Sequence, residues 1–552
     1  MKKTGFLAGA AISTVGIVLC KIIGLVYVIP FYALIGSRGG ALYSYAYSIY
    51  NIFLNLATSG IPVAMSKVIS EYNEMKYFFT KERTFKIGLK IISILCIISF
   101  VVLFVFAPNL AYLIMGNVKG GNTVEDVTLV IRIISTAVLV VPHLSVSKGY
   151  LQGHKIMQVS SVADVLEQLV RVTVILLGSF LTLKVLKLSI RSAVGVSVFA
   201  ATIGALFAYF YVRNKIKKSK GLNRNAKALP NEKKITDKDL VKKIILYALP
   251  FVIISLLETL FVSIDVFTIV KGLTSLGYTT SLSENVNSVI STWGSKLNMI
   301  VMAVSTGIIT SLIPTIASSY AVKNIKEVNS KINQALQMLC LIIIPLSVGI
   351  SFTSKAVWTV FYGYSELNSS IFSLLILSQI PLAICSVLVN TNQAMTNTKA
   401  TVTALLGSLI FKITLNVPMM NLFNTLNLEA YYATITLNII IDVVESIYLM
   451  HKVKMKTNIS FLKAGRTFIK TVLCTLIMVI GMSILKLFLP VYSQSRFISI
   501  IYIIIYGLIG ITIYFIMALK SNTIEEIVGK EYIEKTFNKI KRIFKKQRVK
   551  VD

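Results

Sequence analysis

Long apolar runs alternate with short polar stretches along almost the whole chain of 552 residues. Each run has about 20 residues or more, which is the length that an α-helix needs to cross the hydrocarbon core of a bilayer. About 14 such runs occur, from Gly5–Ile35 near the start to Phe497–Leu519 near the end. The pattern therefore predicts an all-α polytopic membrane protein with about 14 transmembrane helices.

The two halves of the chain resemble each other weakly. Three pairs of segments match in the same order: Ser59–Ser66 with Ser311–Ser318, Ala107–Gly116 with Ser354–Gly363, and Gly149–Gly153 with Asn390–Ala394. The register of the last pair also aligns Arg171 with Lys412. Internal repeats with a site between them are a common plan of secondary transporters. We therefore predict two pseudo-symmetric six-helix lobes followed by two C-terminal helices.

The predicted organisation has five parts, in which a polar, basic segment separates the two lobes. They are an N-lobe at residues 1–213 with helices 1–6, a basic cytoplasmic linker at 214–243, a C-lobe at 244–453 with helices 7–12, helices 13–14 at 454–519, and a basic cytoplasmic tail at 520–552. Apolar residues recur in the tail at spacings that suit an amphipathic helix near anionic lipid headgroups. A solvated, charged tail is the alternative.

Positive charge follows the predicted topology. The chain has a formal net charge of +33, with 56 Lys and Arg against 23 Asp and Glu. The main basic clusters fall in alternate loops and at the C-terminus: Lys67–Lys90, Arg213–Lys243, Lys323–Lys331, Lys452–Lys463 and Lys520–Lys550. The positive-inside rule then places both termini and the linker in the cytoplasm of a bacterial cell, around a multi-pass protein of the cell membrane. This alternation of basic loops accounts for the net charge without a nucleic-acid partner. The loop with Lys184, Lys187 and Arg191 fits it poorly, because the predicted topology places this loop outside the cell.

The sequence has no signature of enzyme chemistry. The five cysteines lie in apolar runs at unrelated spacings, and the three histidines show no pair with ligand spacing. A phosphate-binding loop of the Gly-x4-Gly-Lys-Ser/Thr type is also missing, so the chain has no nucleotide motor of its own. We therefore predict a protein that is not an enzyme and that has no catalytic residues, no metal site and no cofactor.

Cations inside the apolar runs are the strongest functional signal. Lys21, Arg171, Lys296 and Lys412 all lie within predicted membrane helices. A cation in hydrocarbon costs about 2.5–3.5 kcal/mol on insertion scales, so such residues normally face a protein-lined cavity. A cavity lined with cations indicates an anionic substrate. The alternative for the lysines is snorkelling to an interface, and for Arg171 an ion pair with Glu167 on the same helical face.

Acids and tyrosines add further candidates. The acids in or near predicted spans are Glu167, Glu258, Asp265, Asp442 and Glu445. Carboxylates in membranes commonly bind a proton or a sodium ion, so these residues either couple transport to an ion or pair with the cavity cations. Tyr43, Tyr47 and Tyr50 share one helical face. They form an interfacial belt, a packing surface or a surface for sugars.

Several segments resemble a known family. They are Gly36–Tyr43, Ala57–Lys67 with Glu71–Asn73 after it, and Lys148–Gly153 followed by Glu167–Val172. Together they resemble the polysaccharide-flippase branch of the MOP (MATE-like) superfamily. Within that branch the chain is most similar to MurJ-type proteins and stage V sporulation protein B-like flippases, over nearly its whole length.

The resemblance implies alternating access between two lobes and export of lipid II, the undecaprenyl-pyrophosphate-linked peptidoglycan precursor. It also implies a groove for the lipid tail formed by the last two helices. Lys21 and Lys296 match positions of essential arginines in the first and eighth helices, and Asn51 matches a polar position in the second. The chain departs from the pattern at Tyr27 and Leu54, where the family has further arginines, and a second-helix aspartate has no counterpart.

Lys21, Lys296, Arg171, Lys412 and Asn51 are thus the predicted substrate-binding residues. The expected partners are lipid II or a related undecaprenyl-pyrophosphate-linked glycan, membrane lipids, and cell-wall synthesis proteins. One alternative is a flippase for another lipid-linked polysaccharide of the spore cortex, a teichoic acid or a capsule. A second is a MATE-type cation-coupled drug exporter, although the first span carries a lysine and no acid. A scaffold without transport activity gains nothing from charged spans.

Overall fold

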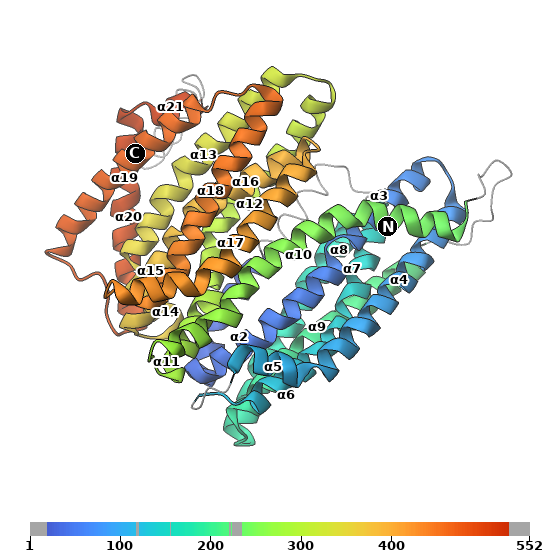
Figure 1. Cartoon of the computed structure of the whole chain (residues 1–552), viewed down its shortest axis with the longest axis horizontal. Coiled ribbons are helices and arrows are strands. Elements are labelled where there is room, and N and C mark those ends of the chain that lie inside the picture. Colours follow the sequence, from blue (N-terminus) through green and yellow to red (C-terminus); the bar gives the residue numbers. More distant parts are fainter. Residues whose placement is uncertain (1–18, 117–120, 155, 220–221, 223–234, 529–552) are drawn as a thin grey trace, which may run out of the picture. The chain divides into compact units, whose positions relative to one another are not determined.

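The computed structural model describes residues 19–116, 121–154, 156–219, 222 and 235–528 (Figure 1). Within these ranges the chain is almost entirely helical and contains no β-strand. By length and composition, 12 segments of the described chain are long and apolar enough to cross a membrane, from Val28–Glu74 to Arg496–Lys520. The predicted class of an all-α polytopic membrane protein is therefore confirmed.

Some sequence predictions reach beyond the described residues. The first predicted run, Gly5–Ile35, lies partly outside them, so the number of about 14 membrane helices stays a prediction. The predicted tail at 520–552 is described only through the short helix α21 (Thr523–Val528), and its amphipathic part lies outside the described residues. The placement of the two termini in the cytoplasm also stays a prediction.

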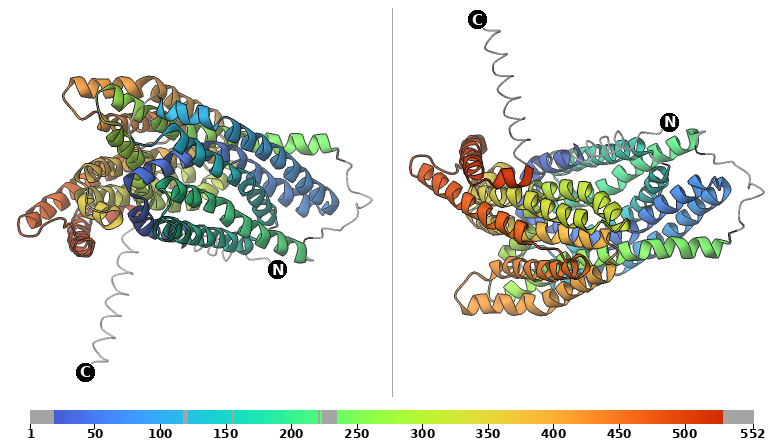
Figure 2. Two further views of the ribbon diagram at one scale, coloured as in Figure 1. Left: turned by 90° about the horizontal axis from the view of Figure 1, so that it is seen from below. Right: turned by 90° about the horizontal axis from the view of Figure 1, so that it is seen from above.

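The chain divides into two compact units. Unit 1 comprises Met1–Lys296 and Leu405–Leu437, and unit 2 comprises Leu297–Ala404 and Asn438–Asp552. These divisions fall at other positions than the predicted lobe and linker boundaries, which stay predictions. Figure 2 shows the helices of both units from two further directions.

Unit 1 contains most of the first half of the chain. Its helices are α2 (Val28–Thr58), α3 (Ile61–Glu74), α4 (Phe78–Val105), α5 (Ala107–Met115), α6 (Val124–Val138), α7 (Val141–Gly153), α8 (Met157–Phe180), α9 (Ile190–Lys218), α10 (Asp237–Ser275) and α11 (Thr280–Ser288), with most of α17 (Thr398–Thr425). Short π-helical segments follow α8 at Leu181–Val185 and α11 at Val289–Trp293.

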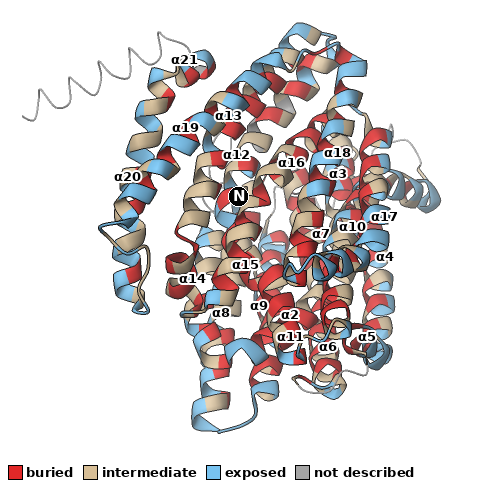
Figure 3. Ribbon diagram, turned by 60° about the vertical axis from the view of Figure 1, so that its left-hand side comes forward, coloured by how far each residue is buried: buried red, intermediate tan, exposed pale blue. Residues whose placement is uncertain are grey.

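Unit 2 contains most of the second half. Its helices are α12 (Gly294–Ala321) and α18 (Ala433–Thr457), which both begin in unit 1, with α13 (Ile325–Phe352), α14 (Ser354–Tyr362), α15 (Glu366–Leu377), α16 (Gln379–Ala394), α19 (Leu462–Lys486), α20 (Arg496–Lys520) and α21. Most residues of α20 are exposed or half-buried (Figure 3). Its buried residues Ser499, Tyr506, Gly510 and Ala518 recur at helical spacing, so a narrow stripe of α20 packs inward and the rest suits contact with lipid.

Prolines mark where several helices of unit 1 begin. Pro62, Pro108 and Pro142 lie in the first turns of α3, α5 and α7. Proline is tolerated there because the first amides of a helix have no intrahelical partner, whereas it disrupts the interior. Two predicted membrane runs are consequently divided into shorter helices, as the pair α6 and α7 shows within the single apolar segment Val124–Gly153.

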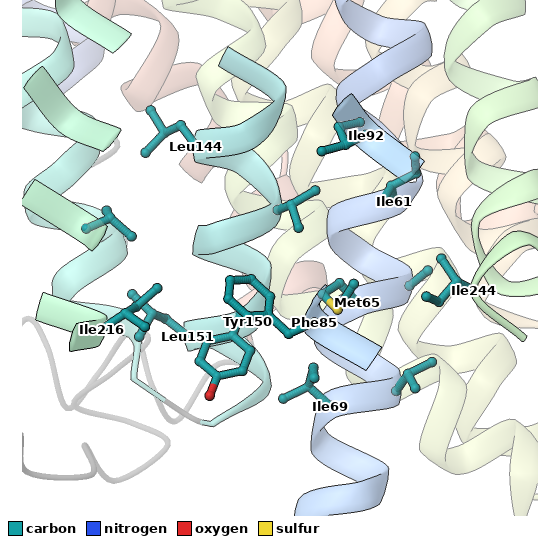
Figure 4. Close-up of a cluster of buried hydrophobic side chains, with 14 of the residues drawn as sticks. Ile61, Met65, Ile69, Phe85, Ile92, Leu144, Tyr150, Leu151, Ile216 and Ile244 are labelled. Carbon is teal, nitrogen blue, oxygen red and sulfur yellow. The ribbon is translucent and has the colours of Figure 1, made fainter. Parts of the chain in front are cut away.

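One hydrophobic core of unit 1 lies between α3, α4, α7 and α10, with further residues from α8 and α9. Met65, Phe85, Tyr150 and Ile244 pack together there with their neighbours (Figure 4). The phenolic hydroxyl of Tyr150 also donates a hydrogen bond to the carboxylate of Glu82 inside this core. The core therefore joins α3 and α4 to α7 and α10, which lie much further along the sequence.

A glycine permits the close packing of α3 on α7. A Cβ atom at Gly149 would lie 2.5 Å from the carbonyl oxygen of Pro62, closer than real Cβ contacts allow. Small residues let helix backbones approach in this way, and they are enriched where membrane helices cross. Gly149 belongs to the segment Lys148–Gly153 that carries the family resemblance, and its structural role is this contact.

A buried carboxylate fixes α11 to the start of α6. Glu284 accepts hydrogen bonds from the backbone amide of Asn122 at 3.2 Å and from the Asn122 side-chain amide at 3.1 Å. Gly121 has φ +95°, and a Cβ atom there would lie 2.6 Å from Glu284 Oε2, so only glycine suits this position. Burial raises the pKa of Glu284 to about 7, against the opposing effects of the Asn122 hydrogen bonds and of Arg38.

Candidate functional site

An aromatic cluster lies inside unit 1, along one face of α2. Tyr43, Tyr47 and Tyr50 follow each other at helical spacing, with ring centroids 4.4 Å and 5.9 Å apart. Trp293, at the end of the π-helical segment before α12, stacks on Tyr43 at 5.9 Å. Gly40 makes room for the indole, because a Cβ atom there would lie 2.7 Å from its Nε1. The tyrosine face that the sequence predicts thus points into the protein.

Lys296 places its ammonium group in this aromatic cluster. Its Nζ donates a hydrogen bond of 2.5 Å to the hydroxyl of Tyr27. The same nitrogen lies 4.5 Å from the ring centroid of Tyr27 and 5.3 Å from that of Trp293. Aromatic faces attract a cation through their quadrupole without neutralising it. No carboxylate in the described residues forms an ion pair with Lys296, so its positive charge is uncompensated by an acid.

Arg171 of α8 reaches the same cluster from another side. Its guanidinium donates a hydrogen bond of 2.7 Å to the hydroxyl of Tyr47 and lies 5.2 Å from the centroid of that ring. The sequence permits an ion pair with Glu167, but within the described chain no such pair forms at 4.0 Å or less. Two cations therefore share one group of tyrosines.

The acids beside Arg171 pair with a different cation. Lys148 of α7 places Nζ 2.5 Å from Asp164 Oδ1 and 3.9 Å from Glu167 Oε2. Lys148 thereby offsets the charge of the two carboxylates of α8, while the polar contact of Arg171 is with Tyr47. Sequence reasoning did not single out Lys148, although it lies in one of the segments that carry the family resemblance. The missing information was which face of α8 packs on α7.

Two of the predicted substrate-binding residues have no polar contact with other described residues. Lys21 is half-buried on the helical segment 19–26, and Asn51 is exposed on α2. A Cβ atom at Gly24, one turn after Lys21, would lie 3.3 Å from Gln168 Nε2, so this first helix packs against α8. Roles of Lys21 and Asn51 in substrate binding stay predictions.

The structure places Lys412 away from solvent and next to an acid. Lys412 is fully buried in unit 1, and its Nζ lies 2.6 Å from Asp265 Oδ1 of α10. Asn416, one turn further along α17, donates from Nδ2 to Thr268 Oγ1 at 2.6 Å and lies 3.4 Å from the same carboxylate oxygen. The repeat alignment of Lys412 with Arg171 therefore relates one cation held by tyrosines to another held by a carboxylate.

The other predicted acids lie on α10 and α18. Glu258 is exposed on α10, while Asp442 and Glu445 are buried on α18 within unit 2. No group of three or more His, Cys, Asp or Glu side chains with the geometry of a metal site occurs among the described residues. Ion coupling at these acids stays a prediction.

An apolar groove lies in unit 2 between α13, α14, α19 and α20. Its volume is about 520 Å³, and its lining includes Pro345, Gly349, Met478, Gly507 and Tyr514. Nothing lies within 4 Å of a Cβ atom built at Gly349 or Gly507, so the two glycines keep the groove open. The helices α19 and α20 are those for which the family resemblance implies a lipid groove.

A bundle of apolar helices with two uncompensated cations in its interior and an apolar groove is typical of a multi-pass membrane transporter. The model of the polysaccharide biosynthesis protein family matches residues 6–318, and the chain belongs to this family.

Curated relatives and solved structures agree with this assignment. The chain is 34% identical over 425 residues to the lipid II flippase MurJ of Bacillus subtilis (strain 168), which covers 75% of this chain and 77% of that protein. It is 24% identical over 366 residues to stage V sporulation protein B of the same organism, covering 66% of this chain and 68% of the relative.

Among solved structures, a lipid II flippase MurJ in an inward closed conformation matches with a TM-score of 0.64 and 17% identity, over 92% of this chain and 98% of that one. An inward-facing multidrug resistance MATE family transporter of the MOP superfamily matches with a TM-score of 0.62 and 15% identity, over 79% and 98%. At such identities these structures show the fold alone. The predicted resemblance to MurJ-type and stage V sporulation protein B-like flippases is confirmed.

Proposed function

We propose that this protein is a lipid-linked oligosaccharide flippase that exports lipid II across the bacterial cell membrane by alternating access. The supporting relative is the Bacillus subtilis lipid II flippase, at 34% identity over three quarters of the chain. The protein acts as a transporter and not as an enzyme, with both termini in the cytoplasm.

One observation carries the proposal: Lys296 and Arg171 are held by tyrosines and not by acids. A cation paired with a carboxylate is offset before a substrate arrives, whereas Lys296 and Arg171, held by tyrosine hydroxyls and ring faces, have no acid among the described residues that offsets them. A guanidinium also offers a planar fork of donors that matches phosphate oxygens. The two residues together suit a pyrophosphate, and the neighbouring tyrosine rings offer apolar faces to sugar rings.

The groove in unit 2 supports a substrate with a lipid tail. Its lining is almost entirely apolar, as a polyprenyl chain requires. The membrane potential then supplies a driving force, because it is negative inside and favours outward movement of an anion by about 2.3 kcal/mol per charge per 100 mV.

A cation-coupled drug exporter is the second candidate, since a MATE family transporter shares the fold. Such a site presents acids to cationic drugs and coupling ions. In unit 1, however, Asp164 and Asp265 each have a lysine ammonium within 2.6 Å. This arrangement favours the flippase.

Complementation tests the proposal. The wild-type chain is expressed in a bacterium depleted of its own lipid II flippase, and growth and externally accessible lipid II are measured. We expect rescue by the wild type and by Lys326→Ala, which removes an exposed lysine at the start of α13. We expect no rescue by Lys296→Ala combined with Arg171→Ala at equal membrane abundance. Failure of a well-expressed wild type would point instead to another lipid-linked polysaccharide or to the drug exporter.

A further inference from the structure

The buried group around Asp265 has the composition of a cation site. Asp265 contributes a carboxylate, Thr268 a hydroxyl oxygen, and Asn416 an amide whose Oδ1 is buried without a hydrogen-bond partner in the described residues. Oxygen ligands of these types are those that hard cations such as Na⁺ prefer. A buried polar atom without a hydrogen-bond partner is unusual in a protein interior. The unpartnered Oδ1 of Asn416 therefore indicates that this position is suited to a ligand.

A cation already lies in this group, and it belongs to the chain. The ammonium of Lys412 lies 2.6 Å from Asp265 Oδ1, and the lysine side chain has no solvent exposure. The ring of Phe261 lies 5.5 Å from the same nitrogen and closes that side with an apolar face. A buried carboxylate in a membrane protein needs a positive partner, and here the partner is covalently attached.

We propose that the Lys412 ammonium is a tethered cation that fills a monovalent-cation site on Asp265, Thr268 and Asn416, so that this chain binds no Na⁺ there. This inference rests on the proposed function and specifies its energy source: export of the anionic headgroup depends on the membrane potential and not on a sodium gradient. Removing the lysine side chain opens the space that its ammonium fills and takes away this positive partner of Asp265. Rotation of the Asn416 amide then turns Oδ1 toward the vacated position.

The first test measures cation binding and does not depend on transport. Purified wild type, Asp265→Asn, Lys412→Met and the double variant Lys412→Met/Asp265→Asn are melted in detergent with NaCl or choline chloride at equal ionic strength. Methionine keeps most of the volume of lysine, and the double variant removes both charges. We expect NaCl to raise the melting temperature of Lys412→Met only, because a ligand that binds the folded state stabilises it. A rise in the wild type that Asp265→Asn abolishes, or no rise in a folded Lys412→Met, would overturn the inference.

The second test keeps the inference falsifiable if Lys412→Met does not fold. Wild-type protein in liposomes containing lipid II is given a potassium diffusion potential in either sodium or choline buffer, and the rate of lipid II movement is measured. Equal rates in the two buffers support the tethered cation, whereas a requirement for a sodium gradient overturns it and leaves the flippase intact. Absence of lipid II movement in both buffers would count against the proposed function, and the cation site would still be decided by melting the wild type and Asp265→Asn with and without NaCl.

Discussion

The contact between Glu284 and Asn122 predicts that stability depends on pH in a defined window. Burial raises the pKa of Glu284 from the ordinary value of 4.5 to about 7. A group whose pKa is higher in the folded state contributes stability that is complete below its unfolded pKa. That stability is lost as the pH rises through the folded pKa. The difference corresponds to about 3 kcal/mol lost between pH 4.5 and about 8.

The perturbation that isolates this effect is Glu284→Gln, because glutamine has nearly the same shape and does not titrate. Hydrogen exchange of the Asn122 amide, which donates to Glu284, is followed between pH 5 and 8 by mass spectrometry after correction for the intrinsic exchange rate. In the wild type we expect the local opening free energy to fall over this range, and in Glu284→Gln we expect it to stay level. Glu125→Gln serves as the control, since Glu125 is an exposed acid in the first turn of α6. An equal decline of the opening free energy in the wild type and in Glu284→Gln would show that titration of Glu284 is not its cause.

Three further predictions concern packing and the site. Tyr47→Phe removes the hydroxyl that holds Arg171, and because hydrogen bonds to charged groups contribute about 1.5–3 kcal/mol, lipid II flipping should fall about tenfold or more at unchanged abundance. Gly149→Ala pushes α3 away from α7, so the detergent-solubilised variant should melt at a lower temperature than the wild type. Gly465→Ala is the control and should not lower the melting temperature, because the space around its Cβ is open. Gly507→Leu fills the groove in unit 2 and should lower flipping of lipid II more than that of a short-chain analogue.

The membrane-helix pattern was predictable from the sequence because run length and hydropathy are local properties. The same is true of the tyrosine face, since Tyr43, Tyr47 and Tyr50 recur at the helical period. Proline positions locate the starts of α3, α5 and α7 for an equally local reason. Features of this kind depend on a few neighbouring residues, so the packing of distant helices does not change them.

The pairing of charges was not predictable in the same way. Spacing along α8 favours Glu167 with Arg171, yet Lys148 of α7 lies closer to the acids of α8 and Tyr47 receives the guanidinium. The repeat alignment likewise treats Lys412 and Arg171 as equivalents, whereas Lys412 lies on Asp265. These contacts depend on which helix faces pack together. A single sequence carries little information about such packing.

We propose that Lys296 and Arg171 form an anion site for the lipid II headgroup. The most direct measurement is lipid II flipping by purified protein in liposomes with an imposed potential, comparing the wild type, Lys296→Ala/Arg171→Ala and Lys326→Ala. We expect movement by the wild type and by Lys326→Ala, and loss of movement in the double variant despite normal folding. Full activity of a folded double variant would show that Lys296 and Arg171 do not form the headgroup site.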